Sequence, residues 1–156
     1  MLKSWLDWLL GRSLPTSKGE QMITQALIDS VKEGEGLRLK PYRCTAGKLT
    51  IGFGRNLDDV GITQEEAEYL LKHDLEKAEK EAEKFPVYSK LNQARKDVLI
   101  EMVFNMGYSR LSGFKKMFEA LEKGDYSAAA DQMLDSSWHK QVGKRAERLA
   151  YFMRIG

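Results

Sequence analysis

The feature that most constrains this chain is a change of hydrophobic period at Gly34–Gly36. From Glu20 up to these glycines, apolar residues recur at three- and four-residue steps, as they do on one face of a helix. After the glycines, residues 41–53 (PYRCTAGKLTIGF) alternate loosely between apolar and polar, and TAGK is typical of a turn. The segment therefore predicts a helix that is followed directly by a small hairpin sheet.

Most of the residues beyond the hairpin have a helical pattern. Thr63 and Glu66 form a capping-box pair at the start of one long helix, and this helix should end near Lys84, before Pro86. Four more helices are expected, at residues 92–106, 114–123, 126–134 and 144–153. The prediction is an α+β fold, mostly α. A helix-plus-hairpin lobe (about residues 20–84) is joined through the long helix to an all-helical lobe (about residues 85–156).

Residues 1–19 form a separate amphipathic segment and linker. Five apolar residues share one helical stripe: Leu2, Trp5, Leu6, Leu9 and Leu10. The stripe is too short to span a bilayer, which takes ~20 apolar residues, and Asp7 makes it a poor signal peptide. A helix that packs on its own domain is favoured, and a helix that lies in a membrane interface is the alternative.

Charge and cysteine content exclude few functions. The net charge of +2 is too small to argue for nucleic acid, although residues 138–156 hold five Lys/Arg against one acid. That basic face would suit an anionic polymer or would simply be a solvated helix face. A single cysteine excludes an intramolecular disulfide. His73 and His139 are isolated from other ligands, so we expect no metal and no cofactor.

Three polar residues around the hairpin suggest chemistry. Eight residues separate Glu35 from Cys44, and five separate Cys44 from Thr50. A partly desolvated glutamate at a helix end could donate a proton to a leaving glycosidic oxygen, while the other two hold a water. Taken alone, each residue also has an ordinary structural explanation: a solvated carboxylate, a small buried thiol and a strand-forming threonine.

A thiol nucleophile is a rival use of Cys44. Such a nucleophile needs a partner base, and His73 and His139 are the only histidines. Neither lies in a recognisable nucleophile context, so a cysteine hydrolase is not favoured.

The stretch EGLRLKPYRCTAGKLTIGFG resembles the active-site signature of the phage-type lysozymes, glycoside hydrolase family 24. That pattern is a glutamate, eight residues, an aspartate or cysteine, five residues and a threonine, and the chain meets it without a gap. The resemblance continues through GITQEEAEYLLKHDL, VLIEMVFNMG and SSWHKQVGKRAERLAYFMRIG, and so covers about residues 20–156. It implies a two-lobed lysozyme-like fold. It also implies hydrolysis of the β-1,4 bond between N-acetylmuramic acid and N-acetylglucosamine in peptidoglycan, with inversion of configuration at the anomeric carbon.

The resemblance also implies the roles of the three residues. Glu35 is the general acid, Cys44 takes the base or water-positioning role that is usually given to aspartate, and Thr50 helps to hold the water. A free thiol has a pKa of ~8.5 and is a poorer base than a carboxylate at neutral pH. We therefore expect Cys44 mainly to position water, with partial thiolate character if a cation such as Arg43 lies near.

The same resemblance implies roles for further residues. Phe104 and Gln132 match substrate-cleft positions. Met117 and Asn56 stand where the family pattern has serine and leucine, which weakens the expectation of sugar contacts there. Arg145 matches the arginine that faces the catalytic glutamate. The family pattern also has a histidine paired with a carboxylate. In this chain Arg55 replaces the histidine, Asp74 matches the carboxylate, and we expect the two to form an ion pair.

The partners and location follow from this interpretation. The chain is expected to be a monomeric phage or prophage endolysin that is made in the host cytoplasm without an evident signal peptide and acts on the cell wall. A holin would then be one route of release, and no nucleic-acid partner is expected. A catalytically weak glycan-binding homologue and a membrane-active protein remain as alternatives from other functional classes.

Overall fold

The computed structural model describes residues 23–156 and divides the chain into two compact units, one ending at Ile62 and one beginning at Thr63. The predicted stripe from Leu2 to Leu10 lies outside the described residues. Most of the described residues are helical, and a small antiparallel sheet completes the α+β fold that the sequence predicts. The predicted lobe boundary near residue 84 stays a prediction.

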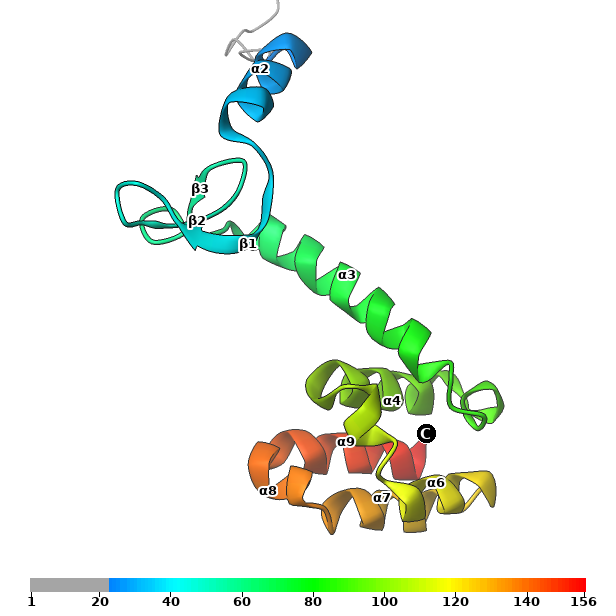
Figure 1. Cartoon of the computed structure of the whole chain (residues 1–156). Coiled ribbons are helices and arrows are strands. Elements are labelled where there is room, and N and C mark those ends of the chain that lie inside the picture. The colour runs from blue at the N-terminus through cyan, green and yellow to red at the C-terminus, as the bar shows by residue number, and fades with distance from the viewer. Residues whose placement is uncertain (1–22) are drawn as a thin grey trace, which may run out of the picture. The chain divides into compact units, whose positions relative to one another are not determined.

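In the described part of the first unit, residues 23–62, a helix precedes the sheet (Figure 1). Helix α2 (Gln25–Glu35) begins at Thr24, whose hydroxyl caps the Leu27 amide, and ends at Gly36. Strands β1 (Arg38–Arg43), β2 (Leu49–Gly52) and β3 (Arg55–Asn56) pair antiparallel in that order. The hairpin is confirmed, and β3 is an addition that the sequence pattern did not predict because it is only two residues long.

Helix α3 (Gln64–Ala82) opens the second unit, and its predicted capping box is confirmed. The Thr63 hydroxyl accepts the Glu66 amide at 3.2 Å, and the Glu66 carboxylate accepts the Thr63 amide at 2.8 Å. These two bonds satisfy amides that would otherwise be unpaired at the start of the helix. A short 3₁₀ turn η1 (Tyr88–Lys90) follows, after Pro86.

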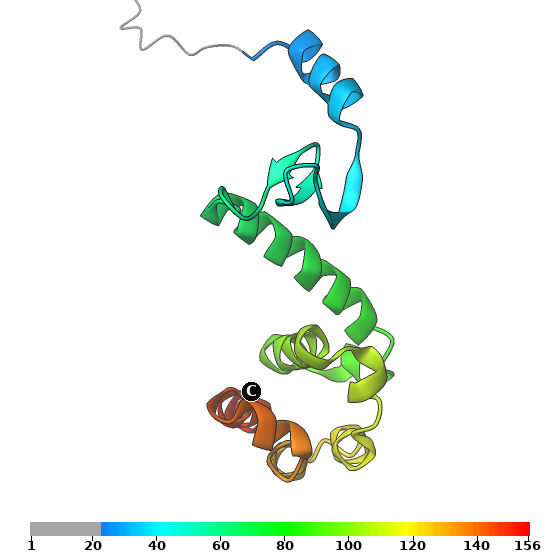
Figure 2. The same ribbon diagram turned by 60° about the vertical axis from the view of Figure 1, so that its left-hand side comes forward.

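Six further helices complete the second unit. They are α4 (Gln93–Met106), α5 (Tyr108–Leu111), α6 (Lys115–Glu122), α7 (Tyr126–Leu134), α8 (Ser137–Val142) and α9 (Lys144–Ile155). α9 packs against α4, α7 and α8, while α6 packs on α7 and α3 on α4, an arrangement that can be followed in Figure 1 and Figure 2. The predicted helices match α4, α6, α7 and α9 to within two residues. α5 and α8 are short and were not predicted.

The buried apolar core of the described residues lies entirely between Ala78 and Met153, in the second unit. Trp138 is its largest fully buried side chain and donates its indole N–H to Asn105 at 2.7 Å. A buried indole needs such an acceptor. In the first unit, no described apolar side chain is buried, and Thr50 is the buried polar residue there.

The basic C-terminal face is largely neutralised by ion pairs. Glu101 accepts hydrogen bonds from Arg145 and Arg148, and Arg154 pairs with Asp131. Three of the five cations noted in the sequence therefore have carboxylate partners. This favours an ion-paired, solvated helix face over a site for an anionic polymer.

Candidate active site

Glu35 is the last residue of α2, and its carboxylate lies against the backbone of Gly54. The helix ends there because Gly36, at φ +68°, turns the chain and donates its N–H to the Lys32 carbonyl at 3.0 Å. A Cβ added at Gly54 would lie only 2.7 Å from the Glu35 Oε2 atom, and Gly54 itself has φ +81°. The positive φ favours glycine at Gly54, and a side chain added there would push the Glu35 carboxylate aside. Glu35 is exposed, and its expected desolvation stays a prediction.

Cys44 follows β1 and begins the turn of the hairpin. Its N–H donates to the Lys48 carbonyl at 3.0 Å, and its carbonyl accepts the Gly47 N–H at 2.8 Å. The turn therefore holds the backbone of Cys44 by two hydrogen bonds, and the residue is half-buried. This sets the position of the thiol relative to the facing strand.

Thr50 lies in the middle strand and is 4% exposed. It pairs with Tyr42 on β1 and Asn56 on β3. Its hydroxyl donates to the Lys48 carbonyl at 3.0 Å, the same carbonyl that accepts the Cys44 amide. One carbonyl thus holds both residues, and the structure brings the Cys44 thiol and the Thr50 hydroxyl within hydrogen-bonding reach of each other.

Hydrogen bonds in the turn lower the pKa of the Cys44 thiol below its ordinary value. The backbone of Ala46 contributes most, followed by the Thr50 hydroxyl and the backbone of Lys48, while partial burial acts in the opposite direction. The expected cation, Arg43, instead donates its Nη1 hydrogen to the Gly47 carbonyl at 2.8 Å. Because the groups that bond the thiol are backbone and hydroxyl groups rather than imidazole, the arrangement does not support a cysteine–histidine nucleophile.

The Thr50 hydroxyl has a single hydrogen, which decides how it can act on a water. When that hydrogen points to the Lys48 carbonyl, the oxygen of Thr50 accepts a hydrogen bond from the thiol or from a water. When the hydrogen turns toward a thiolate, it stabilises the negative charge. The pair can therefore hold a water and accommodate a change in the charge of Cys44.

Asn56 and Arg55 both form hydrogen bonds with the loop that follows β3. The Asn56 amide donates to the Asp59 carboxylate at 2.9 Å and accepts the Asp59 N–H at 3.1 Å. Arg55 donates its Nε hydrogen to the Gly61 carbonyl at 2.9 Å. The expected sugar contact of Asn56 and the expected pair of Arg55 with Asp74 stay predictions.

Two aspartates that the sequence analysis did not single out fasten this loop to β2. The Asp58 carboxylate accepts the Leu49 N–H at 2.8 Å, and Asp59 forms an ion pair with Lys48 at 2.8 Å. Both bonds hold the strand segment that carries Thr50. The NLDD sequence, which begins at the last residue of β3, is the signal that could have revealed them, because Asn and Asp commonly bond nearby backbone amides.

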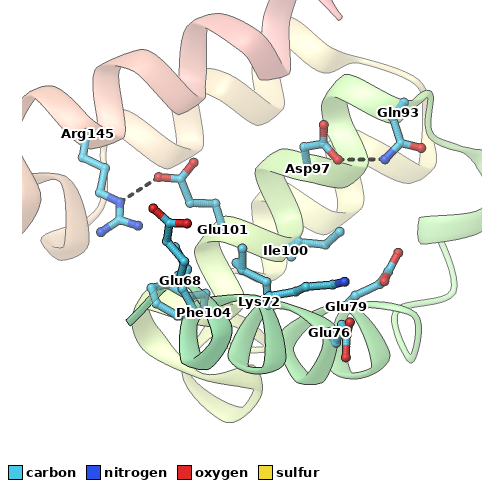
Figure 3. A pocket seen from close by; sticks show the side chains of 12 residues that line it. Glu68, Lys72, Glu76, Glu79, Gln93, Asp97, Ile100, Glu101, Phe104 and Arg145 are labelled. Carbon is cyan, nitrogen blue, oxygen red and sulfur yellow. Dashed lines mark hydrogen bonds and ion pairs between the residues drawn. The ribbon is translucent and has the colours of Figure 1, made fainter. Parts of the chain in front are cut away.

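In the second unit, Phe104 and Arg145 line a pocket of about 640 Å³ (Figure 3). Phe104 is 39% exposed on α4. Arg145 reaches from α9 to α4, where its Nε hydrogen bonds the Glu101 carboxylate at 2.9 Å. Glu101 is a residue that the sequence analysis missed, and it also binds Arg148 at 2.8 Å. The apolar side chains of Leu71, Leu75 and Ile100 also line this pocket. Asp74 lines a smaller pocket with Phe104.

Gln132 and Met117 come together at a third pocket of the second unit, of about 390 Å³. Gln132, on α7, is partly buried. Met117, on α6, is 0% exposed and belongs to the apolar core. The amide of Gln132 is thus the group of this pair that remains accessible to a ligand.

Residues 23–156 contain neither a cluster of metal ligands nor a membrane-spanning helix. Over this part of the chain, no group of three or more His, Cys, Asp or Glu side chains could hold a metal ion. No helix among the same residues has the length and apolar character that a bilayer crossing requires.

Comparisons with known proteins identify the family. The family model described as phage lysozyme matches residues 32–151. A probable T4-type lysozyme of Dictyostelium discoideum is 29% identical over 164 aligned positions, covering 86% of this chain and 96% of that protein. An endolysin of Acyrthosiphon pisum secondary endosymbiont phage 1 is 36% identical, with 74% and 80% covered. An endolysin of Salmonella phage P22 is also 36% identical, with 75% and 82% covered. The chain therefore belongs to the phage lysozyme family, and it is a glycoside hydrolase.

Proposed function

We propose that this glycoside hydrolase is a muramidase, which cleaves the β-1,4 bond between N-acetylmuramic acid and N-acetylglucosamine in peptidoglycan with inversion. The observation that supports it best is that the Lys48 carbonyl accepts hydrogen bonds from both the Cys44 N–H and the Thr50 hydroxyl. These two bonds hold Cys44 and Thr50 together on one hairpin. In the same unit, Glu35 is presented at a helix end against Gly54. Family membership supports the substrate class.

In the proposed mechanism, protonated Glu35 gives its proton to the glycosidic oxygen as the bond from that oxygen to the anomeric carbon breaks. A water held by Cys44 and Thr50 attacks the anomeric carbon from the opposite face. The proton that this water loses passes to the Cys44 thiolate. Exchange with solvent then returns a proton to Glu35 and removes one from Cys44. Because the amides of the turn lower the pKa of Cys44, the thiolate is more available than in an ordinary cysteine.

The remaining predicted residues would act in binding and electrostatics. Phe104 and Gln132 would contact the glycan, as part of the pockets that they line. The role of Arg145 opposite the catalytic glutamate is proposed from the family resemblance, and within the second unit its Nε hydrogen bonds Glu101. We further propose that the protein acts as a phage or prophage endolysin in host lysis and reaches the wall with the help of a holin.

Product analysis tests the proposed function. Mass spectrometry of fragments released from purified sacculi should show muropeptides with N-acetylmuramic acid at the reducing end, and NMR of fresh product should show the α-anomer first. Reducing-end N-acetylglucosamine would contradict the proposed bond specificity. An initial β-anomer would contradict inversion. Liposome leakage without sugar release would instead support the membrane-active alternative.

The close approach of Glu35 to Gly54 gives a matched pair of variants. Gly54→Ala would place a Cβ against the carboxylate, whereas Gly61→Ala meets no atom within 4 Å at a similar φ of +63°. Both should lose about 1–2 kcal/mol of stability, because alanine is strained at positive φ. Only Gly54→Ala should also lose hydrolysis, by up to ~10²-fold, because it displaces the proton donor. Thermal melts and turnover on sacculi measure both effects. Equal activities of the two variants would show that this contact does not position Glu35.

A further inference from the structure

The peptide group between Lys48 and Leu49 is hydrogen-bonded on both of its sides. Its carbonyl accepts the Cys44 N–H and the Thr50 hydroxyl, each at 3.0 Å. Its N–H, which belongs to Leu49, donates to the Asp58 carboxylate at 2.8 Å. The carbonyl and the N–H of a trans peptide lie in one rigid plane and point in opposite directions. The carboxylate that fixes the N–H therefore also fixes the direction of the carbonyl.

Asp58 stands where a regular sheet has a backbone acceptor. The Leu57 N–H donates to the Leu49 carbonyl at 2.7 Å, which continues the pairing of β2 with β3 by one residue. In a regular antiparallel pair of this kind, the two residues exchange both of their hydrogen bonds. Here the Asp58 carboxylate receives the Leu49 N–H. A charged acceptor makes a stronger hydrogen bond than a carbonyl does, and it polarises the peptide so that the Lys48 carbonyl becomes a better acceptor.

The next residue, Asp59, has a different kind of contact. Its carboxylate pairs with the Lys48 side chain at 2.8 Å, and the lysine and aspartate side chains are 45% and 53% exposed. Exposed ion pairs contribute little to stability, and a lysine side chain can turn without moving its own backbone. Asp58 is therefore the aspartate of this pair that acts on the backbone of the site.

We propose that Asp58 is a positioning residue of the reaction: its carboxylate fixes the Lys48–Leu49 peptide, whose carbonyl keeps the two water-holding side chains in place. The inference rests on the proposed function. With the peptide in this orientation, the hydrogen of the Thr50 hydroxyl points to the Lys48 carbonyl, and the hydroxyl oxygen is left to accept a hydrogen bond from the water. If the peptide turned, Thr50 would lose this acceptor and Cys44 would lose the bond to its amide.

Two substitutions of Asp58 test the proposal through turnover on sacculi. Asp58→Ala removes the acceptor of the Leu49 N–H, and because Asp58 is exposed a water can replace the carboxylate without holding the peptide. Its kcat should fall about 10–10²-fold, the scale of a misplaced reacting group. KM should stay close to the wild-type value, because no proposed glycan contact is changed. Asp58→Asn should recover most of the loss, since its amide oxygen can still accept the same N–H.

Asp29→Ala is the control for the loss of a carboxylate. Asp29 is exposed on α2, in the same unit, and bonds the Gln25 side chain. This variant should keep wild-type activity. If Asp58→Ala kept the wild-type kcat, or if Asp58→Asn lost as much as Asp58→Ala, the hydrogen bond to Leu49 would not position the reacting groups and the inference would be wrong.

Amide NMR spectra of the free protein test the same contact without catalysis. The Cys44 N–H bonds the carbonyl side of the peptide, opposite the side that bonds Asp58. Asp58→Ala should shift the amide protons of both Leu49 and Cys44 upfield, the direction of a weaker hydrogen bond, and should speed their exchange with solvent. Asp58→Asn should leave the Cys44 resonance close to its wild-type position.

A shift at Leu49 alone would show that the peptide keeps its direction without Asp58, which would overturn the inference. If the wild type released no sugar from sacculi but the Cys44 resonance moved as expected, the proposed reaction would fail, while the control of the Lys48 carbonyl by Asp58 would stand.

Discussion

Glu35→Gln is expected to reduce peptidoglycan hydrolysis by ~10²–10⁴-fold, the usual range for removing a general acid. Glutamine has nearly the shape of glutamic acid but cannot give a proton to the leaving oxygen. The exposed position of Glu35 at the end of α2 means that the change removes no buried contact, so the melting temperature should stay close to that of the wild type. Release of soluble muropeptides from sacculi measures the effect.

Glu33→Gln is the matched control for this variant. Glu33 lies on the same helix, is also exposed, and loses the same charge on substitution. It should retain wild-type activity. If Glu35→Gln stayed within threefold of the wild type, Glu35 would have no part in the proposed mechanism.

The second large effect concerns Cys44. Cys44→Ala should lose ~10²–10⁴-fold in activity, because the attacking water loses both a contact and its proton acceptor. Cys44→Asp should remain active, because a carboxylate fills the same role. Alkylation should silence the wild type and leave Cys44→Asp unaffected, since Cys44 is the only thiol in the chain. Thr45→Ala, an exposed neighbour in the same turn, serves as the control.

The pH profile distinguishes a thiolate base from a thiol that only positions water. Hydrogen bonds from the turn lower the pKa of Cys44, so the thiolate fraction at any given pH is higher than for an ordinary cysteine. The limb of the wild-type pH profile that reports Cys44 should therefore lie below the ordinary thiol pKa. In Cys44→Asp this limb should move several units lower, toward the carboxyl pKa of ~3.9. If Cys44→Ala were fully active, Cys44 would have a role in packing only and none in the reaction.

Much of the helical part of the fold could be read from local sequence signals. The Thr63–Glu66 capping box, the start of α4 at Asn92 and the bounds of α7 all depend on residues close together in the chain. α5 and α8 escaped prediction because helices of four and six residues have too few turns to show a period. α8 also carries Trp138, whose burial in the core is a tertiary effect.

For the candidate site, the sequence by itself determined which side-chain types are present and how they are spaced along the chain. These side-chain types would let Glu35 donate a proton and let Cys44 and Thr50 hold a water, and the resemblance of their spacing to the phage-type lysozyme signature is what assigns them these predicted roles. The sequence also places a turn between Cys44 and Thr50, since Thr45–Lys48 is typical turn sequence.

Only the tertiary structure decided which atoms meet. It showed that one carbonyl, that of Lys48, holds both Cys44 and Thr50, and that Gly54 leaves room for Glu35. It also paired Arg145 with Glu101 and buried Met117. The physical reason is that hydrogen bonds and close approaches form between residues brought together by folding, and a change of about a few tenths of an ångström in the interatomic distance makes or breaks them. Periodicity and spacing describe a residue's place along its own helix or strand, and leave open which atoms of other elements it will meet.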